Sequence, residues 1–202
     1  MSLEVRWIIG GVLPPEMIVW FGPFPGGIEL RRDSYLVSRT SSDTAVKIRG
    51  DSQLDVKVYG RSPDLLTVPG RAQGRLEWWR KWSFPLRPAT EDTELAGWAS
   101  VQKVRRIQFF SLEGRPIPTA ATATGEDACA VELTNVSVGR DRWWTLGFEA
   151  TGPSRALVDG LKQSASLVFE HPLPGDLELD VADSTSYSGW LHRLWNDTGR
   201  GF

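Results

Sequence analysis

The stretch T-A-V-K-I-R-G-D-S-Q-L-D-V-K-V-Y, residues 44–59, decides the fold class. Apolar residues alternate with polar ones before and after G-D-S, at Val46, Ile48, Leu54, Val56 and Val58. Residues two apart in a strand share one face, so each half predicts a strand with one apolar and one polar face. Gly-Asp-Ser between the halves suits a tight turn. The stretch therefore predicts an antiparallel hairpin.

Similar runs recur along the 202 residues, rich in β-branched and aromatic side chains and mostly bounded by Gly, Pro, Asp or Ser. We expect strands at residues 3–9, 35–39, 44–49, 53–59, 75–84, 98–110, 128–138 and 142–150. Short links between consecutive strands favour an antiparallel meander over parallel crossovers. Apolar residues at helical spacing predict helices at 154–170 and 184–196, whereas the Gly- and Pro-rich segment 17–28 predicts a loop.

The expected fold is a β-dominated α+β fold. It is a closed or nearly closed antiparallel β-barrel of about eight strands, with helices packed outside. No segment is long enough to act as an interdomain linker, so residues 1–202 are expected to form a single domain.

Composition narrows the function. The chain has 23 basic and 25 acidic residues, so we expect no nucleic-acid partner, because such binders usually carry a basic excess. No apolar run approaches the roughly 20 residues that a membrane helix needs, so no membrane partner is expected. The single cysteine, Cys129, allows no internal disulfide. A reducing compartment fits that count, and we expect a cytoplasmic protein. Its oligomeric state is left open.

The polar strand faces allow three interpretations. They can be solvated, which is the usual meaning of alternation in an antiparallel sheet. They can line the inside of a closed barrel, where crowded cations require a counter-charge and therefore an anionic ligand. The third interpretation is a lipocalin-like carrier of an apolar ligand with the apolar faces inward, suggested by the ten Trp residues and the short strands.

A series of motifs in a fixed order is informative. The chain reads S-L-E-V-R at 2–6, V-K-I-R-G at 46–50, L-D-V-K at 54–57, E-W-W-R-K-W-S-F at 77–84, V-Q-K-V-R-R at 101–106, A-V-E-L at 130–133, L-G-F-E at 146–149 and S-Y-S-G-W-L at 186–191. From residue 2 to residue 191 this series resembles the CYTH superfamily, also called triphosphate tunnel metalloenzymes. That family includes inorganic, thiamine and fungal-type RNA triphosphatases and one class of adenylate cyclases.

The resemblance implies roles for ten residues. Those that would bind the phosphates of the substrate are Arg6, Lys47, Arg49, Lys57, Lys81, Lys103 and Arg105. Those that would hold Mg²⁺ or Mn²⁺ and act in catalysis are Glu4, Glu132 and Glu149. Arg80 is an alternative to its neighbour Lys81, because the motif does not show which of the two faces inward.

Two acids of the family pattern are missing, because Ser2 and Gly147 stand in their places. The resemblance implies that a basic tunnel binds triphosphate or polyphosphate and hydrolyses a triphosphate with a divalent metal. The missing acids raise the alternative of a catalytically degraded module that binds polyphosphate or nucleotide. The substrate is open among inorganic triphosphate, thiamine triphosphate, ATP and longer polyphosphate.

Overall fold

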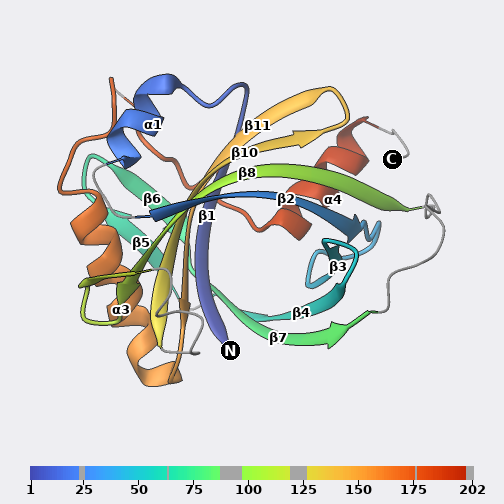
Figure 1. Ribbon diagram of the computed structural model, residues 1–202, viewed down its shortest axis with the longest axis horizontal. Coiled ribbons are helices and arrows are strands. Elements are labelled where there is room, and N and C mark those ends of the chain that lie inside the picture. Colours follow the sequence, from blue (N-terminus) through green and yellow to red (C-terminus); the bar gives the residue numbers. More distant parts are fainter. Residues whose placement is uncertain (23–25, 63, 87–96, 119–126, 176, 199–202) are drawn as a thin grey trace.

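The computed structural model describes residues 1–22, 26–62, 64–86, 97–118, 127–175 and 177–198. Its centre is a closed, antiparallel, eight-stranded barrel (Figure 1). In order around the barrel the strands are β10 (Ala128–Val138), β11 (Asp141–Thr151), β1 (Ser2–Gly10), β7 (Glu77–Pro85), β4 (Gln53–Arg61), β3 (Thr44–Arg49), β2 (Gly26–Leu36) and β8 (Trp98–Ser111). Pairing of β8 with β10 closes the ring, so the predicted fold class is confirmed.

Smaller elements surround the barrel. Strand β9 (Pro116–Ile117) pairs with the end of β8, and β5 (Leu65–Val68) and β6 (Ala72–Arg75) form a separate two-stranded sheet. The described helices are α1 (Pro15–Phe21), α3 (Ser154–Val168) and α4 (Tyr187–Thr198). Among the described residues, no helix has both the length and the hydropathy needed to cross a membrane.

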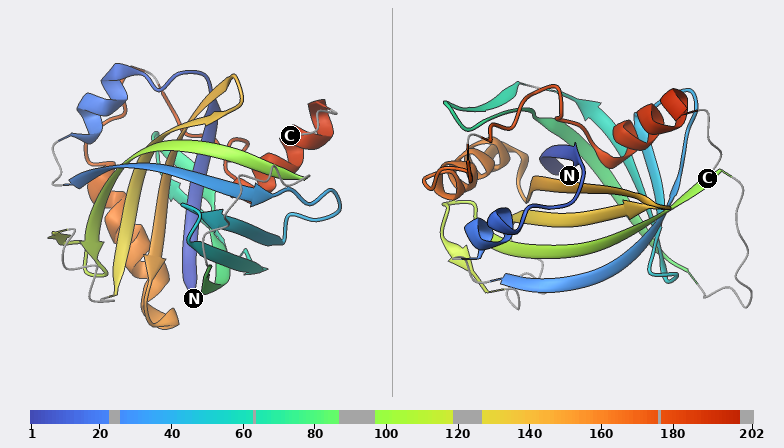
Figure 2. Two further views of the ribbon diagram at one scale, coloured as in Figure 1. Left: turned by 45° about the vertical axis from the view of Figure 1, so that its right-hand side comes forward. Right: turned by 90° about the horizontal axis from the view of Figure 1, so that it is seen from above.

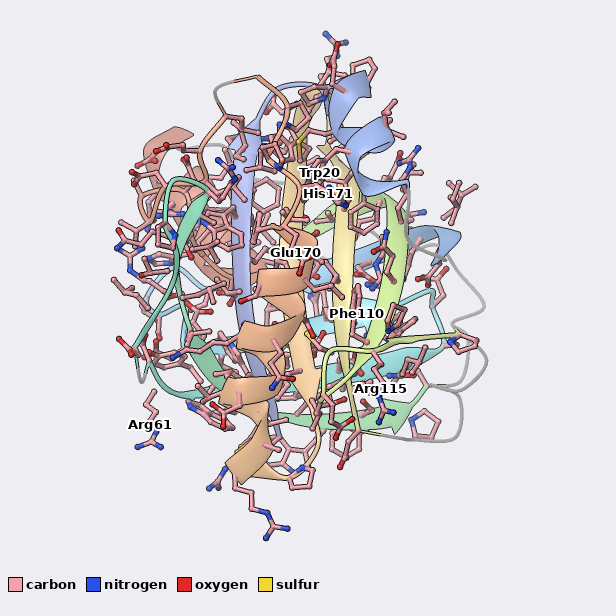
Figure 3. All side chains as sticks on the ribbon, turned by 90° about the vertical axis from the view of Figure 1, so that its left-hand side faces the viewer. Trp20, Arg61, Phe110, Arg115, Glu170 and His171 are labelled. Carbon is pink, nitrogen blue, oxygen red and sulfur yellow. The ribbon has the colours of Figure 1, made fainter. Side chains whose placement is uncertain are left out.

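The main hydrophobic core lies outside the barrel, between its wall and α3. In Figure 3, α3 crosses in front of β1, β10 and β11. Leu157 and Leu161 of α3 are fully buried against outward-facing residues of the wall, including Trp7 and Phe148. Trp7 and Phe148 meet edge to face, with ring centroids 6.4 Å apart. Burial of these apolar side chains fixes the wall at β1, β10 and β11.

Helix α4 has a different place from α3. The right-hand view of Figure 2 shows the two helices on opposite sides of the molecule. Trp190 and Leu191 of α4 pack in a second core with Ile8, Val101 and Val136. These three wall residues belong to the same strand faces as the charged residues of the lumen, because they are offset from them by even numbers. Helix α4 therefore covers one end of the barrel interior, whereas the expectation placed both helices outside.

Residues 17–28, expected to be a loop, contain most of α1 and the first residues of β2 among those described. Strand β2 begins at Gly26 and not at residue 35, as the sequence suggested. Gly26 lies in the strand, beside β8. A Cβ at this position would lie 2.3 Å from the carbonyl oxygen of Ile107 on β8, so only glycine fits there. Close backbone approach, not a turn, explains this glycine.

Candidate functional site

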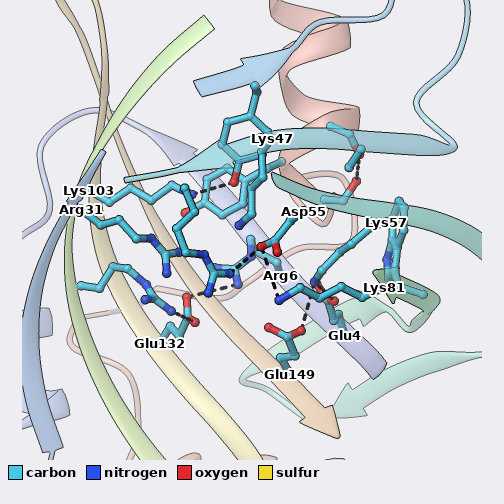
Figure 4. Close-up of a pocket in the computed structure, with 18 residues that line it drawn as sticks. Glu4, Arg6, Arg31, Lys47, Asp55, Lys57, Lys81, Lys103, Glu132 and Glu149 are labelled. Atoms are coloured by element: carbon cyan, nitrogen blue, oxygen red, sulfur yellow. Dashed lines mark hydrogen bonds and ion pairs between the residues drawn. The ribbon is translucent and has the colours of Figure 1, made fainter. Parts of the chain in front are cut away.

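A charged cavity occupies the barrel interior (Figure 4). Every strand of the barrel contributes to its lining, and residues 186–188 at the start of α4 contribute as well. All ten residues singled out in the sequence lie in this lining, namely Glu4, Arg6, Lys47, Arg49, Lys57, Lys81, Lys103, Arg105, Glu132 and Glu149. The free volume left between the side chains is about 80 Å³, which is room for a few water molecules.

The orientation of the strands excludes the apolar carrier, which required apolar faces inward. Lys81 lines the interior, whereas its neighbour Arg80 lines a separate hollow at the outer wall with Trp78. The choice between these two residues is thereby settled in favour of Lys81.

The lining is cationic overall. It contains four carboxylates and eight cationic side chains, so its formal charge is +4 when all are ionised. The cation that sequence reasoning missed is Arg31 on β2. Because β2 was expected to start at residue 35, the alternation of Glu29, Arg31 and Asp33 along it was not read as a strand.

The first of four ion-pair clusters surrounds Glu132. Its carboxylate accepts hydrogen bonds from Arg105 and from Nη2 of Arg6, the latter at 3.4 Å. Nη1 of Arg6 donates to Oγ1 of Thr145 at 3.1 Å. Burial alone would raise the pKa of Glu132, but Arg105 and Arg6 outweigh it and hold the pKa well below its usual range.

Gly147 explains how Arg6 reaches Glu132. Residues 6, 147 and 132 are direct neighbours across β1, β11 and β10. A Cβ at Gly147 would lie 2.7 Å from Cζ of Arg6. The guanidinium therefore occupies the space that a side chain at 147 would need. Gly147, where the resemblance would place a carboxylate, is thus the position that admits this arginine.

The second cluster surrounds Lys57. Glu4 and Glu149 are direct cross-strand neighbours, a placement that is unfavourable for two like charges. Nζ of Lys57 donates to both carboxylates, at 3.0 Å to Oε1 of Glu149. Burial and the neighbouring Glu149 raise the pKa of Glu4, whereas Lys57 lowers the pKa of Glu149 to about 2 in spite of burial. Ser2 donates its hydroxyl to Glu4 at 2.9 Å.

The third cluster surrounds Asp33, which is fully buried. Its Oδ2 accepts from Nζ of Lys103 at 2.7 Å and lies 3.6 Å from Nζ of Lys47, while Nε of Arg31 lies 3.2 Å from Oδ1. Lys103 Nζ also donates to the hydroxyl of Tyr35 at 2.7 Å. Burial lowers the pKa of Lys47 to about 7; Asp33 opposes that shift, and Arg31 adds to it.

Asp55 forms the centre of the fourth cluster and is also fully buried. Its Oδ2 lies 2.9 Å from Nη2 of Arg49 and 3.4 Å from Nζ of Lys81. Ser83 and Gln53 donate to Oδ1 at 2.7 and 2.6 Å. Asp33 and Asp55 therefore provide part of the counter-charge that the sequence argument assigned entirely to a ligand. A strand pattern shows that an Asp faces inward but not which cations it meets.

The three carboxylates expected to hold Mg²⁺ or Mn²⁺ do not form one group. Glu132 pairs with two arginines, whereas Glu4 and Glu149 share Lys57. Across the described ranges, no cluster of three or more His, Cys, Asp or Glu side chains has the arrangement to hold a metal ion. Divalent cations bind carboxylate oxygens that are free to coordinate them. The donor set of this lumen does not fit the expected metal, because each of these carboxylates is already paired with at least one protein cation.

No protein-family profile and no curated protein sequence matches the chain. Two archaeal proteins of known structure are similar in fold. A conserved hypothetical protein from Pyrococcus furiosus aligns with a TM-score of 0.50 and 13% identity over 94% of this chain and 99% of its own. A protein from Pyrococcus horikoshii OT3 aligns with a TM-score of 0.51 and 14% identity over 98% of this chain and 99% of its own.

A Hippeastrum protein described as a candidate adenylyl cyclase with a dominant triphosphatase activity aligns less well. Its TM-score is 0.43, with 12% identity over 83% of this chain and 87% of its own. The two archaeal likenesses, at such low identity, show that this chain shares their fold and nothing about its ligand.

Proposed function

We propose that the barrel interior binds a small linear oligophosphate, for which inorganic triphosphate is the simplest probe. The observation that carries this proposal is the convergence of eight cationic side chains on one cavity inside a closed barrel. Arginine forks and lysine ammonium groups suit phosphate oxygens, and a confined cationic site favours a small polyanion. The order of motifs, similar to that of the triphosphate tunnel family, supports the same ligand class.

Unused hydrogen-bond donors also support this ligand class. In the described part of the chain, the Nε atoms of Arg49 and Arg105 are buried and lack a hydrogen-bond partner. Buried donors normally have partners, so two orphaned guanidinium donors in one cavity point to an acceptor that completes the site. A phosphate oxygen is such an acceptor.

Hydrolysis with Mg²⁺ or Mn²⁺, which the family resemblance implies, is not part of this proposal. Glu4, Glu132 and Glu149 are each paired with a protein cation, and this pairing competes with metal binding and with the orientation of an attacking water. Phosphate release from triphosphate with either ion is therefore the control reaction of the binding experiment. Sustained release would restore the triphosphatase reading.

The proposal is tested by calorimetric titration of the protein with tripolyphosphate, with sulfate at equal ionic strength as the reference anion. Lys81→Gln removes a lumen cation, and Arg80→Gln is its matched control because it removes a neighbouring charge that does not line the lumen. We expect Lys81→Gln to weaken binding about tenfold, as for loss of one charge-assisted hydrogen bond, and Arg80→Gln to change it less than about twofold. Absence of binding by the unaltered protein, or equal losses in both variants, would refute the proposal.

A further inference from the structure

We propose that the oligophosphate enters this lumen free of divalent cation, because lysine and arginine side chains already neutralise the carboxylates that a metal would need. This inference rests on the proposed function and specifies its ligand. Enzymes that act on phosphoanhydrides commonly take the metal complex of the substrate, so a preference for the metal-free anion would set this barrel apart.

The first observation concerns Lys57. Its ammonium nitrogen lies between Glu4 and Glu149, donating to one Oε1 of each, at 3.0 Å to Glu149. A divalent cation bridging these two carboxylates would coordinate the same oxygens. Lys57 therefore competes with a metal for these two oxygens, and its charge already offsets part of the repulsion between the two carboxylates.

The second observation concerns the other carboxylate, Glu132. Arg6 and Arg105 engage one oxygen each, so neither is left bare. Gly147 completes this arrangement, since the guanidinium of Arg6 fills the space that a side chain there would take. At this place the barrel wall therefore presents the guanidinium of Arg6 to the oligophosphate, and not a carboxylate to a metal ion.

The charge of the lining gives the third observation. Its formal excess of four positive charges falls to three when Asp33, beneath Lys103 and Lys47, is included. Free triphosphate carries about four to five negative charges at neutral pH, because the terminal phosphate groups titrate near pH 6. The lining therefore offsets most of the charge of the free anion without help from a divalent cation.

The test is to titrate the unaltered protein with tripolyphosphate in EDTA and again in excess Mg²⁺ or Mn²⁺. We expect excess Mg²⁺ or Mn²⁺ to weaken binding about tenfold relative to binding in EDTA, because the metal complexes the ligand. Tighter binding with the metal than in EDTA would overturn this inference but leave the proposed function intact. Absence of binding under every condition would overturn the proposed function itself.

A variant makes the role of Lys57 directly visible. Lys57→Met leaves Glu4 and Glu149 without their shared cation, and we expect it to bind Mn²⁺, seen as loss of the free-ion paramagnetic resonance signal and as metal-dependent thermal stabilisation. Lys57→Arg keeps the charge and should not bind Mn²⁺. Mn²⁺ binding by the unaltered protein as tight as by Lys57→Met would contradict the inference. If Lys57→Met fails to fold without metal, the titrations of the unaltered protein decide.

Discussion

Apart from β8, which lies between β2 and β10, the barrel wall has two halves that differ on both of their faces. The half made by β10, β11 and β1 carries Glu132, Glu149 and Glu4 inside, and its outer face is buried beneath α3 (Figure 3). The half made by β7, β4, β3 and β2 carries most of the cations inside, and its outer face is open to solvent at Leu30, which is 78% exposed, and Phe84, which is 50% exposed.

The difference separates stability from binding. Apolar burial under α3 stabilises the acidic half, made by β10, β11 and β1. The outer face of the cationic half, made by β7, β4, β3 and β2, contributes less to stability. Substitutions of outward residues should therefore be costly on the first half and cheap on the second. Substitutions of inward residues should act through the ion-pair clusters on either half. The predictions below follow this contrast from the largest effect to the smallest.

The largest effect is expected at Phe148, on the outer face of β11. Its ring is fully buried and packs 5.8 Å from the ring of Phe169 and 6.4 Å from Trp7. Phe148→Ala should lower the free energy of unfolding by about 3–5 kcal/mol, because it removes buried apolar area and leaves a cavity. Urea denaturation followed by Trp fluorescence measures the change. A loss below about 1 kcal/mol would show that α3 does not fix this half of the wall.

Asp33→Asn should have the next largest effect. It removes the charge that pairs with Lys103, Lys47 and Arg31 inside the lumen. Leaving those cations without a counter-charge should cost about 3 kcal/mol. Lys103 and Lys47 hold the pKa of Asp33 well below its usual range in spite of burial, so its contribution is present above about pH 4 and is lost as pH falls further.

Acid-induced unfolding of both proteins tests this assignment. The unaltered protein should lose more stability below about pH 4 than Asp33→Asn, which has no carboxylate to protonate. Added tripolyphosphate should recover part of the lost stability at neutral pH, since its charge replaces that of Asp33. If the unfolding free energies of the two proteins fell equally steeply below about pH 4, the role given to Asp33 would be contradicted.

Period-2 alternation predicted which side chains share a strand face, as Lys47 and Arg49 show, but it left open whether that face is solvated or lines a closed barrel. The inward direction of the cations followed from the family resemblance. The pairing of those cations could not be predicted, since Asp33 and Asp55 meet them only through closure of the ring. The start of strand β2 was predicted wrongly because a glycine such as Gly26 is typical of a loop in the sequence. Its close contact with β8, which explains the glycine, is visible only in the structure. The position of α4 also escaped prediction, since one amphipathic face fits a barrel end as well as a barrel wall.

Gly147→Ala tests the crowding inside the acidic half. The new methyl group would lie 2.7 Å from Cζ of Arg6, so the guanidinium must move and its contact with Glu132 must change. We expect a cost of about 1–3 kcal/mol in stability. Arg6→Lys removes the planar head group, so the double variant should lose less than the sum of the two single losses. Additive losses in this double-mutant cycle would show that the two positions are independent.

Lys47, on the cationic half, should make ligand binding depend on pH. Its pKa is lowered to about 7 by burial, against the opposing effect of Asp33. A bound polyanion favours the protonated amine, so tripolyphosphate binding should take up a proton and weaken as pH rises from about 7 to 8.5. Calorimetry in buffers of different protonation enthalpy measures the uptake. Lys47→Met should bind tripolyphosphate more weakly, and its affinity should depend less on pH. An equal pH dependence in both proteins would show that another group takes up the proton.

The same shift has a smaller consequence for the protein without ligand. Between about pH 7 and the ordinary lysine value of 10.5, the unfolded chain holds a proton that folded Lys47 has released. Folding is therefore penalised by this residue below pH 7, and the penalty fades as pH rises toward 10.5. The unfolding free energy of Lys47→Met should lack that rise, and urea titrations at pH 7 and pH 9 would reveal the difference.

The smallest effect is expected at Leu30, on the outer face of β2. Its side chain is mostly exposed, so Leu30→Thr removes little buried area and places a β-branched residue, which suits a strand, at this position. The unfolding free energy should change by less than about 0.5 kcal/mol, and tripolyphosphate affinity should not change. A loss approaching that of Phe148→Ala would mean that the outer face of the cationic half is covered in solution. In that case the exposed apolar residues of the cationic half would form a contact surface. The outer faces of both halves would then be covered, one by α3 and the other by a partner molecule.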